Sequence, residues 1–259
     1  MNFSQSNISP EAKIGHGTIV EPFATIQSDV IIGENCWIGP YVSIMNGTRI
    51  GNNCKIFPGA VLGAVPQDLK FNGEASLLEI GDHTIIREYC TLNRGTKASM
   101  TTKVGSHSLL MAYVHVAHDC FVGNHVILAN NVTLAGHIDI HDYAILGGLT
   151  AVHQFVKIGP HVMVGGGSLV MKDIPPFAKA AREPLTYEGV NTIGLRRRGF
   201  SKEQLDRIHD IYRYLFIKNR NISIGIKMIE AELPDSEERR QILDFVRNSS
   251  RGIMKGHRR

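Results

Sequence analysis

The sequence has no run of eighteen apolar residues, and its first fifteen residues lack the basic and apolar segments of a secretory signal. These two absences predict a soluble, cytoplasmic protein with no transmembrane segment. Collagen-like and disordered chains are excluded, because 43% of the 259 residues are hydrophobic and only 20% are charged. The chain therefore has enough apolar material for a sizeable core.

Charge is distributed unevenly along the chain. Residues 1–178 hold 10 Lys and Arg against 13 Asp and Glu, a net charge of −3, whereas residues 179–259 hold 18 against 11, a net charge of +7. A basic segment of this size predicts an acidic partner, such as a phosphate-bearing ligand, a nucleic acid or an acidic protein.

An aliphatic residue recurs at every sixth position over most of the chain. From Ile8 to Val170, 25 of the 28 positions spaced by six are Ile, Leu or Val, and the exceptions are Asp68, Glu74 and Ala98. A small or β-branched residue commonly follows four positions later. A period of six fits neither a lone amphipathic helix nor a simple alternating strand.

This period predicts a mainly β fold, a parallel β-helix of hexapeptide repeats in which 18 residues close one triangular coil. The β-helix is expected over residues 1–178. Because a coil that loses its interior residue sends its chain outward, the breaks in the period predict projecting loops at 64–79 and 96–103. Residues 179–259 carry helical patterning instead and are expected to form a basic α-helical domain.

Three helices are expected in this domain. Ser201 and Gln204 have the spacing of a capping box before an amphipathic run that ends near Lys218. Further helices are expected near 223–233 and 236–249.

The cysteines follow the same period. Each occupies the small-residue position four places after an aliphatic, which favours packing over metal or disulfide roles in a reducing cytoplasm. They are Cys36, Cys54, Cys90 and Cys120.

Folding the sequence at 18 residues per coil brings four histidines toward one corner of the prism. They are His115, His118, His137 and His153. Three neutral imidazoles could hold zinc with an open position, as in a carbonic-anhydrase-like β-helix. Alternatively, one imidazole, whose ordinary pKa is about 6.5, could serve as general base for a hydroxyl nucleophile.

His118 has two neighbours that suit acyl transfer. Asp119 follows it and could orient or polarise the imidazole. Gly136 lies one coil above, where its backbone N–H could approach a developing oxyanion. A base with an oxyanion donor about 5 Å away describes acyl transfer better than metal binding, so no metal is expected.

Six longer segments carry a specific resemblance. They are PQDLKFNGE (66–74), LNRGT (92–96), HVAHDC (115–120), LANNVTLAGH (128–137), GGLTAVHQF (147–155) and GLRRRGFS (194–201). Together they closely resemble the bacterial UDP-N-acetylglucosamine acyltransferase family, over essentially the whole chain.

The resemblance implies a left-handed β-helix and a homotrimer with sites in the clefts between subunits. It also implies transfer of a 3-hydroxyacyl chain from acyl carrier protein to the 3-hydroxyl of UDP-N-acetylglucosamine, the first step of lipid A biosynthesis. No resident cofactor is implied, since the 4′-phosphopantetheine arrives on the carrier protein. No nucleic acid partner is implied either.

The resemblance further assigns roles to individual residues. It makes His118 the general base and the Gly136 backbone the oxyanion donor, with Asp68 and Lys70 contacting the sugar and the donor's pantetheine or phosphate region. The residues implied to line the nucleotide-sugar cleft are His115, His137, His153 and Gln154. Those implied to hold donor or nucleotide phosphates are Asn191, Arg197 and Arg198.

Two further positions bear on specificity. Asn191 and Arg198 are seven residues apart, a spacing that would place them on one face of a helix. Gly166 lies where the family sets groove depth, and its lack of a side chain favours a long acyl chain. Ile193 stands where better-known members usually carry a glutamate, which leaves that contact to the nucleotide in question.

Three other functions stay open on sequence alone. The first is a hexapeptide-repeat acyltransferase acting on an amino sugar or a different nucleotide sugar. The second is a zinc hydratase, and the third is a non-catalytic scaffold that uses the prism as a spacer.

Overall fold

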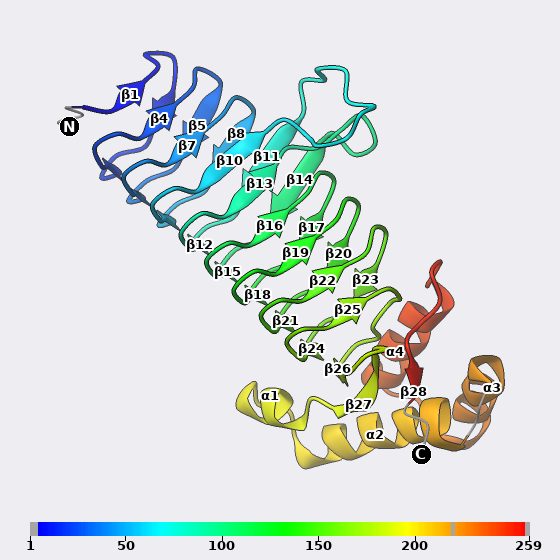
Figure 1. The fold of residues 1–259 in the computed structure, drawn as a ribbon. Coiled ribbons are helices and arrows are strands. Elements are labelled where there is room, and N and C mark those ends of the chain that lie inside the picture. The colour runs from blue at the N-terminus through cyan, green and yellow to red at the C-terminus, as the bar shows by residue number, and fades with distance from the viewer. Residues whose placement is uncertain (1–4, 219–220, 257–259) are drawn as a thin grey trace.

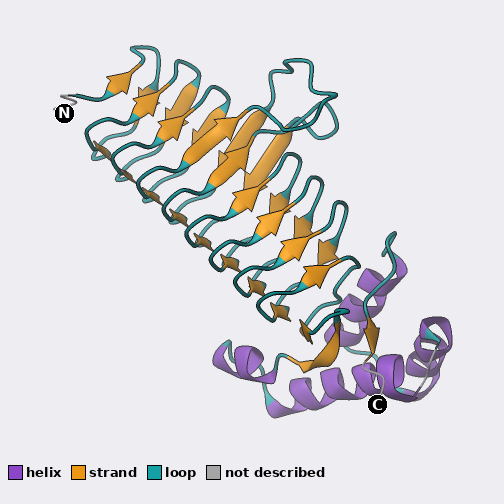
Figure 2. Cartoon of the chain, viewed as in Figure 1, coloured by secondary structure: helices purple, strands orange, loops and turns teal. Residues whose placement is uncertain are grey.

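The computed structural model describes residues 5–218 and 221–256, which form a long triangular prism with helices at its C-terminal end (Figure 1). Its coils wind as a left-handed parallel β-helix, as expected, and each coil gives one short strand to each of three sheets. Figure 2 shows how turns and short strands alternate along the whole prism.

The three sheets form the three sides of the prism. The first sheet contains, in order, β1 (Asn7–Ile8), β4 (Thr25–Ile26), β7 (Ser43–Ile44), β10 (Val61–Ala64), β13 (Thr91–Asn93), β16 (His115–Val116), β19 (Thr133–Leu134), β22 (Ala151–Val152) and β25 (Leu169–Val170). The second contains β2 (Lys13–Ile14), β5 (Val30–Ile32), β8 (Thr48–Ile50), β11 (Leu77–Ile80), β14 (Thr101–Val104), β17 (Phe121–Val122), β20 (Asp139–Ile140) and β23 (Lys157–Ile158).

The third sheet begins with β3 (Ile19–Val20), β6 (Trp37–Ile38), β9 (Lys55–Ile56), β12 (Ile85–Ile86), β15 (Leu109–Leu110), β18 (Ile127–Leu128), β21 (Ile145–Leu146) and β24 (Met163–Val164). It continues with β26 (Ala178–Ala181), β27 (Thr186–Val190) and β28 (Lys255–Gly256).

The register confirms the 18-residue coil. His115 pairs with Thr133 and Val116 pairs with Leu134, one coil later. Because each step of 18 repeats the same interior position, the aliphatic side chains stack into one continuous core. All four cysteines are buried in this core, in the positions that the period predicted.

Two loops project where the period breaks, but each returns to the prism earlier than expected. The first covers residues 65–76 and ends where β11 begins, rather than extending over 64–79. The second covers 94–100 rather than 96–103. Leu78 and Thr102 explain the difference. Both are fully buried, so each chain re-enters the coil two residues before its next interior aliphatic.

The helical region closes the C-terminal end of the prism. It consists of α1 (Thr192–Arg197), α2 (Lys202–Tyr212), the π-helical η1 (Arg213–Lys218), α3 (Ile222–Glu232) and α4 (Glu237–Arg247). The predicted capping box is present, with the Ser201 and Gln204 side chains each accepting from the other's backbone N–H. Ser236 caps α4.

The transition from prism to helices comes later than residue 178. That position lies inside β26, and the antiparallel pair β26 and β27 extends the third sheet to Val190. The two predicted domains, 1–178 and 179–259, include residues 1–4, 219–220 and 257–259, which lie outside the described residues. Among the described residues, no helix has the length and apolar character needed to cross a membrane.

Candidate active site

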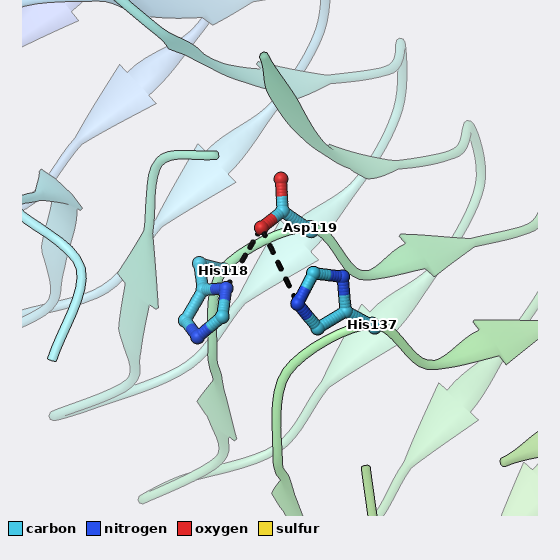
Figure 3. Close-up of side chains that lie close together, drawn as sticks. All are labelled: His118, Asp119 and His137. Atoms are coloured by element: carbon cyan, nitrogen blue, oxygen red, sulfur yellow. Dashed lines mark hydrogen bonds and ion pairs between the residues drawn. The ribbon is translucent and has the colours of Figure 1, made fainter. Parts of the chain in front are cut away.

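A histidine and an aspartate form the centre of the candidate site, at the corner that joins the first and second sheets (Figure 3). His118 Nδ1 lies 2.8 Å from Asp119 Oδ2, and the two residues are only 6% and 2% exposed. Asp119 has a φ of 58°, a left-handed turn conformation that aspartate tolerates better than most residues. The turn between β16 and β17 thus holds the two adjacent side chains together.

Asp119 is held by further donors from the second projecting loop. The Thr96 backbone N–H and hydroxyl donate to it at 3.0 and 2.7 Å, and those of Ser99 donate at 3.3 and 2.5 Å. Burial alone would raise the pKa of this carboxyl, but the hydrogen bonds from Ser99, Thr96 and His118 lower it well below its ordinary value. Asp119 is therefore a carboxylate throughout the working pH range.

The ionised carboxylate decides which His118 nitrogen is free. Since Asp119 can only accept, neutral His118 carries its proton on Nδ1 and donates it to Asp119. Nε2 is then left with a lone pair. It has no hydrogen-bond partner among the described residues, yet it is not fully enclosed. This is the arrangement of a general base whose tautomer is fixed by a neighbouring acid.

Gly136 lies directly against this imidazole. A Cβ added at Gly136 would lie 2.6 Å from Cε1 and 2.8 Å from Nε2 of His118, closer than real contacts allow. Any side chain at this position would displace the imidazole. Within the described residues no acceptor takes up the Gly136 N–H, so this donor is available beside Nε2, as the 18-residue spacing predicted.

His137 completes the group that the structure brings together. Its Nε2 lies 3.9 Å from Asp119 Oδ2, and its ring is edge-on to that of His118, with centroids 5.1 Å apart. On its other side the ring stacks on Phe155 at 4.7 Å. A pocket of about 270 Å³ opens beside Asp119, His137 and Phe155, and Lys157 also lines it.

The other expected histidines do not join this group. His115, on the first sheet, pairs its Nδ1 with Thr91 Oγ1 at 2.8 Å, and burial lowers its pKa. His153 and Gln154 are exposed, and His153 Nδ1 lies 3.2 Å from the Gln154 carbonyl oxygen. His118 and His137 therefore form one close pair, His153 lies in the equivalent turn of the next coil at the same corner, and His115 lies on the adjoining first sheet.

Asp68 and Lys70 lie in the first projecting loop. Asp68 Oδ1 accepts a hydrogen bond from the Lys70 backbone N–H at 2.9 Å, and the Lys70 side chain is exposed. In the part of the chain that the structure describes, no hydrogen bond or ion pair joins either residue to His118. The loop leaves the prism between β10 and β11, at the corner that carries the dyad two coils later.

Asn191 and Arg198 gather at a different corner, the one joining the second and third sheets. Asn191 Nδ2 donates to the His161 carbonyl at 2.9 Å, and Arg198 Nη2 donates to the Tyr143 carbonyl at 3.1 Å. The expected shared helix face is wrong, because α1 has only six residues and the pair are its two caps. They converge through stacked coils instead. Arg197 is exposed.

Three further residues near the C-terminal end of the prism differ in their burial. His161 stacks between Tyr143 and Phe177, and burial together with the nearby Arg198 charge lowers its pKa to about 4. Gly166 is exposed at the corner between the third and first sheets, across the first sheet from His118. Ile193 lies on α1 and is 68% exposed.

The donor atoms of His118, Asp119 and His137 lie within 4.8 Å of one another, a spacing at which a metal ion could be held. The hydrogen bonding fits a proton better. His118 Nδ1 already faces Asp119 at hydrogen-bond distance, and the carboxylate also accepts from Thr96 and Ser99. A zinc ligand set would need Nδ1 deprotonated and the carboxylate oxygen about 2.0–2.2 Å from the metal.

Sequence reasoning missed the loop residues that hold Asp119. Thr96 and Ser99 lie in the break of the period, where no repeat position predicts where a side chain points. Thr102 was within reach of that reasoning. It occupies the small-residue position two before Val104, and its buried hydroxyl accepts from the Asp119 N–H at 2.8 Å.

Models of known protein families match both the repeat region and the C-terminal region of the chain. Residues 29–64 and 101–136 match the bacterial transferase hexapeptide (six repeats) family. Residues 173–254 match the second domain of UDP-N-acetylglucosamine O-acyltransferase.

Named relatives align with most or nearly all of the chain. A protein of Thiobacillus denitrificans named acyl-[acyl-carrier-protein]–UDP-N-acetylglucosamine O-acyltransferase is 47% identical over 77% of this chain and 78% of its own. One of the same name from Campylobacter concisus is 39% identical over 95% and 94%. The crystal structure of the UDP-N-acetylglucosamine acyltransferase of Bacteroides fragilis matches with a TM-score of 0.97 at 49% identity, over 98% of this chain and 100% of that one.

Proposed function

The chain belongs to the UDP-N-acetylglucosamine O-acyltransferase family, and from this premise we propose how its residues carry out the reaction. The family's activity is transfer of an acyl chain from acyl carrier protein to UDP-N-acetylglucosamine, the first step of lipid A biosynthesis. We propose a 3-hydroxyacyl chain as the group transferred and the sugar 3-hydroxyl as its acceptor. The observation that carries the mechanism is the His118–Asp119 dyad with its free Nε2 beneath Gly136.

In the proposed reaction His118 Nε2 removes the proton of the sugar hydroxyl as its oxygen attacks the thioester carbonyl. Asp119 stabilises the imidazolium that forms, because its carboxylate already accepts the Nδ1 proton at 2.8 Å. The carbonyl oxygen becomes an oxyanion, for which the Gly136 N–H is the available donor. Collapse breaks the carbon–sulfur bond, and the imidazolium protonates the departing pantetheine sulfur.

We propose that the complete site is shared between subunits of a homotrimer. His118 and Arg198 lie at different corners of one prism, separated by one side of the triangle, about 20 Å of chain at six residues per side. A neighbouring prism can bring a second corner to the first. The corner between the third and first sheets carries an exposed apolar column suited to such packing, namely Phe23, Tyr41, Tyr89, Tyr113 and Leu149.

A site shared between subunits would also accommodate the other residues that the family resemblance assigns to substrate binding. His153 lies at the dyad's own corner, in the turn after β22, and His115 lies on β16 of the first sheet, so a ligand laid from the dyad along that sheet toward Gly166 would contact all three. Gly166 exposes backbone there and would leave room for a long acyl chain. Gln154 belongs to the dyad's own corner, whereas Asp68, Lys70 and the phosphate-binding Asn191, Arg197 and Arg198 would then act across the subunit boundary. Acyl carrier protein is the acidic partner for the basic C-terminal region, and the cytoplasmic location stays a prediction.

Subunit mixing tests the shared site together with the activity. His118→Ala and Arg198→Ala chains are unfolded together and refolded at equal amounts, then supplied with 3-hydroxyacyl carrier protein and UDP-N-acetylglucosamine. Each variant alone should be nearly inactive. If the two residues act from different chains, random assembly gives about a quarter of sites both native residues, and activity returns. No recovery in trimers of confirmed mixed composition would contradict sharing.

The same assay tests the substrates. A panel of carrier proteins with 3-hydroxyacyl chains of increasing length should show turnover with UDP-N-acetylglucosamine and a preference for long chains. Turnover of an amino-sugar acceptor in place of the hydroxyl acceptor would overturn the proposed chemistry.

A further inference from the structure

The second projecting loop, residues 94–100, has no role in the reaction as described, yet it makes most of the contacts to Asp119. The donors are two backbone N–H groups and two hydroxyls, from Thr96 and Ser99. The loop is itself ordered by these contacts. The Thr96 hydroxyl donates to Asp119 and accepts from the Ala98 N–H at 3.2 Å, which leaves it one orientation.

The two hydroxyls act on different oxygens of the carboxylate. Thr96 shares Oδ2 with His118, whereas Ser99 binds Oδ1. Ser99 also lies 2.8 Å from the Thr101 carbonyl, but its shorter 2.5 Å distance to a charged acceptor directs its single proton to Asp119. The carboxylate is therefore held by both oxygens, with Oδ2 aimed at the imidazole.

This clamp has a chemical consequence beyond order. A carboxylate that is 2% exposed needs such donors to stay ionised. By drawing charge from Asp119, the donors also limit how strongly it attracts the Nδ1 proton of His118. Removing a donor leaves the carboxylate more basic, which favours the protonated imidazolium and depletes the free base.

We propose that Thr96 and Ser99 are positioning residues for acyl transfer, which makes the loop part of the catalytic apparatus. The proposal rests on the role of His118 given above. They act through Asp119, whose clamped carboxylate orients His118 and keeps the imidazole proton on Nδ1, so that Nε2 is the free base.

The test compares Thr96→Val and Ser99→Ala with a matched control in the assembled enzyme. Ser76 provides the control, because its hydroxyl donates to the Gly95 carbonyl of the same loop at 2.5 Å without touching Asp119. Each loop variant should lower kcat about 10-fold, and the pair together about 100-fold, as expected for misplacement of a reacting group. KM for UDP-N-acetylglucosamine should change less than about twofold. Ser76→Ala should change neither kcat nor the pH profile.

The pH profile separates positioning from simple support of the loop. In the Ser99→Ala and Thr96→Val enzymes, the acid limb of kcat/KM should move to higher pH, and Thr96→Ser should return it to the wild-type position. Added to Asp119→Asn, Ser99→Ala should cause no further loss of kcat. A limb that stays in place while thermal stability falls would overturn the proposal.

The controls also separate this proposal from the general-base assignment. If His118→Ala is inactive while both loop variants behave like Ser76→Ala, the clamp proposal fails and the base assignment stands. If His118→Ala itself keeps normal turnover, the base assignment fails. Should the double variant not fold, Ser99→Ala alone decides the outcome through its pH profile.

Discussion

Replacing Gly136 with alanine would place a methyl group against the catalytic imidazole. The added Cβ would lie 2.6 Å from His118 Cε1 and 2.8 Å from Nε2. Carbon atoms prefer separations of about 3.5–4.0 Å, so the ring must retreat by about 1 Å or the backbone must move. Because the Gly136 backbone does not have a positive φ, the conflict comes from the ring and not from the conformation of the new residue.

The magnitude follows from that displacement. A misplacement of about 1 Å costs on the order of 100-fold in rate, which is about 2.7 kcal/mol of transition-state stabilisation. Overpacking of this kind also costs about 1–3 kcal/mol of stability. We therefore expect Gly136→Ala to assemble normally, unfold at a lower temperature and lose about 100-fold in kcat.

A double-mutant cycle shows whether the ring is the cause. Acyl transfer to UDP-N-acetylglucosamine is measured for Gly136→Ala, His118→Ala and the double variant, together with thermal unfolding. In the His118→Ala background the clash is gone, so Gly136→Ala should cost little further stability and little further activity. Wild-type kcat in Gly136→Ala, or equal losses with and without the ring, would refute this reasoning.

Three further predictions concern other parts of the molecule. The pKa of His161 is lowered to about 4 in the folded protein, so between that pH and the ordinary histidine pKa near 6.5 the unfolded chain binds more protons than the folded one. The free energy of unfolding should therefore fall as pH drops through this range. His161→Phe should flatten this decline in unfolding experiments at fixed protein concentration. Arg197→Glu should raise KM for the acyl carrier protein and weaken its salt dependence while the oligomer stays intact, and unchanged donor kinetics would show that carrier protein docks elsewhere. Chelator and reductant should leave activity unchanged, since the proposed chemistry uses a proton and the four thiols are buried in the core; loss of stoichiometric zinc together with activity would contradict this.

The period of six predicted the fold in detail because the β-helix is nearly one-dimensional. Each interior position depends only on its neighbours one coil away, so counting by 18 along the sequence was enough to place Gly136 over His118. The same counting put all four cysteines in the core. Local signals sufficed for the helices, as the Ser201–Gln204 capping box shows.

Counting by 18 fails wherever the chain leaves the coil. The positions of Thr96 and Ser99 depend on how an irregular loop folds back, and no periodicity describes that. Asn191 and Arg198 show a second cause. Their seven-residue spacing predicts a helix face, but α1 ends too soon, and contacts to carbonyls on the stacked coils bring them together instead.

The central claim is that His118, held by Asp119, is the general base of acyl transfer. It is tested most directly by the dependence of kcat/KM on pH in the wild type and in His118→Ala. The wild type should lose activity on the acid side as the free base becomes protonated, and that limb should be absent from the residual activity of the variant, with kcat at least about 100-fold lower. A correctly assembled His118→Ala enzyme with near-normal turnover and an unchanged acid limb would contradict the account.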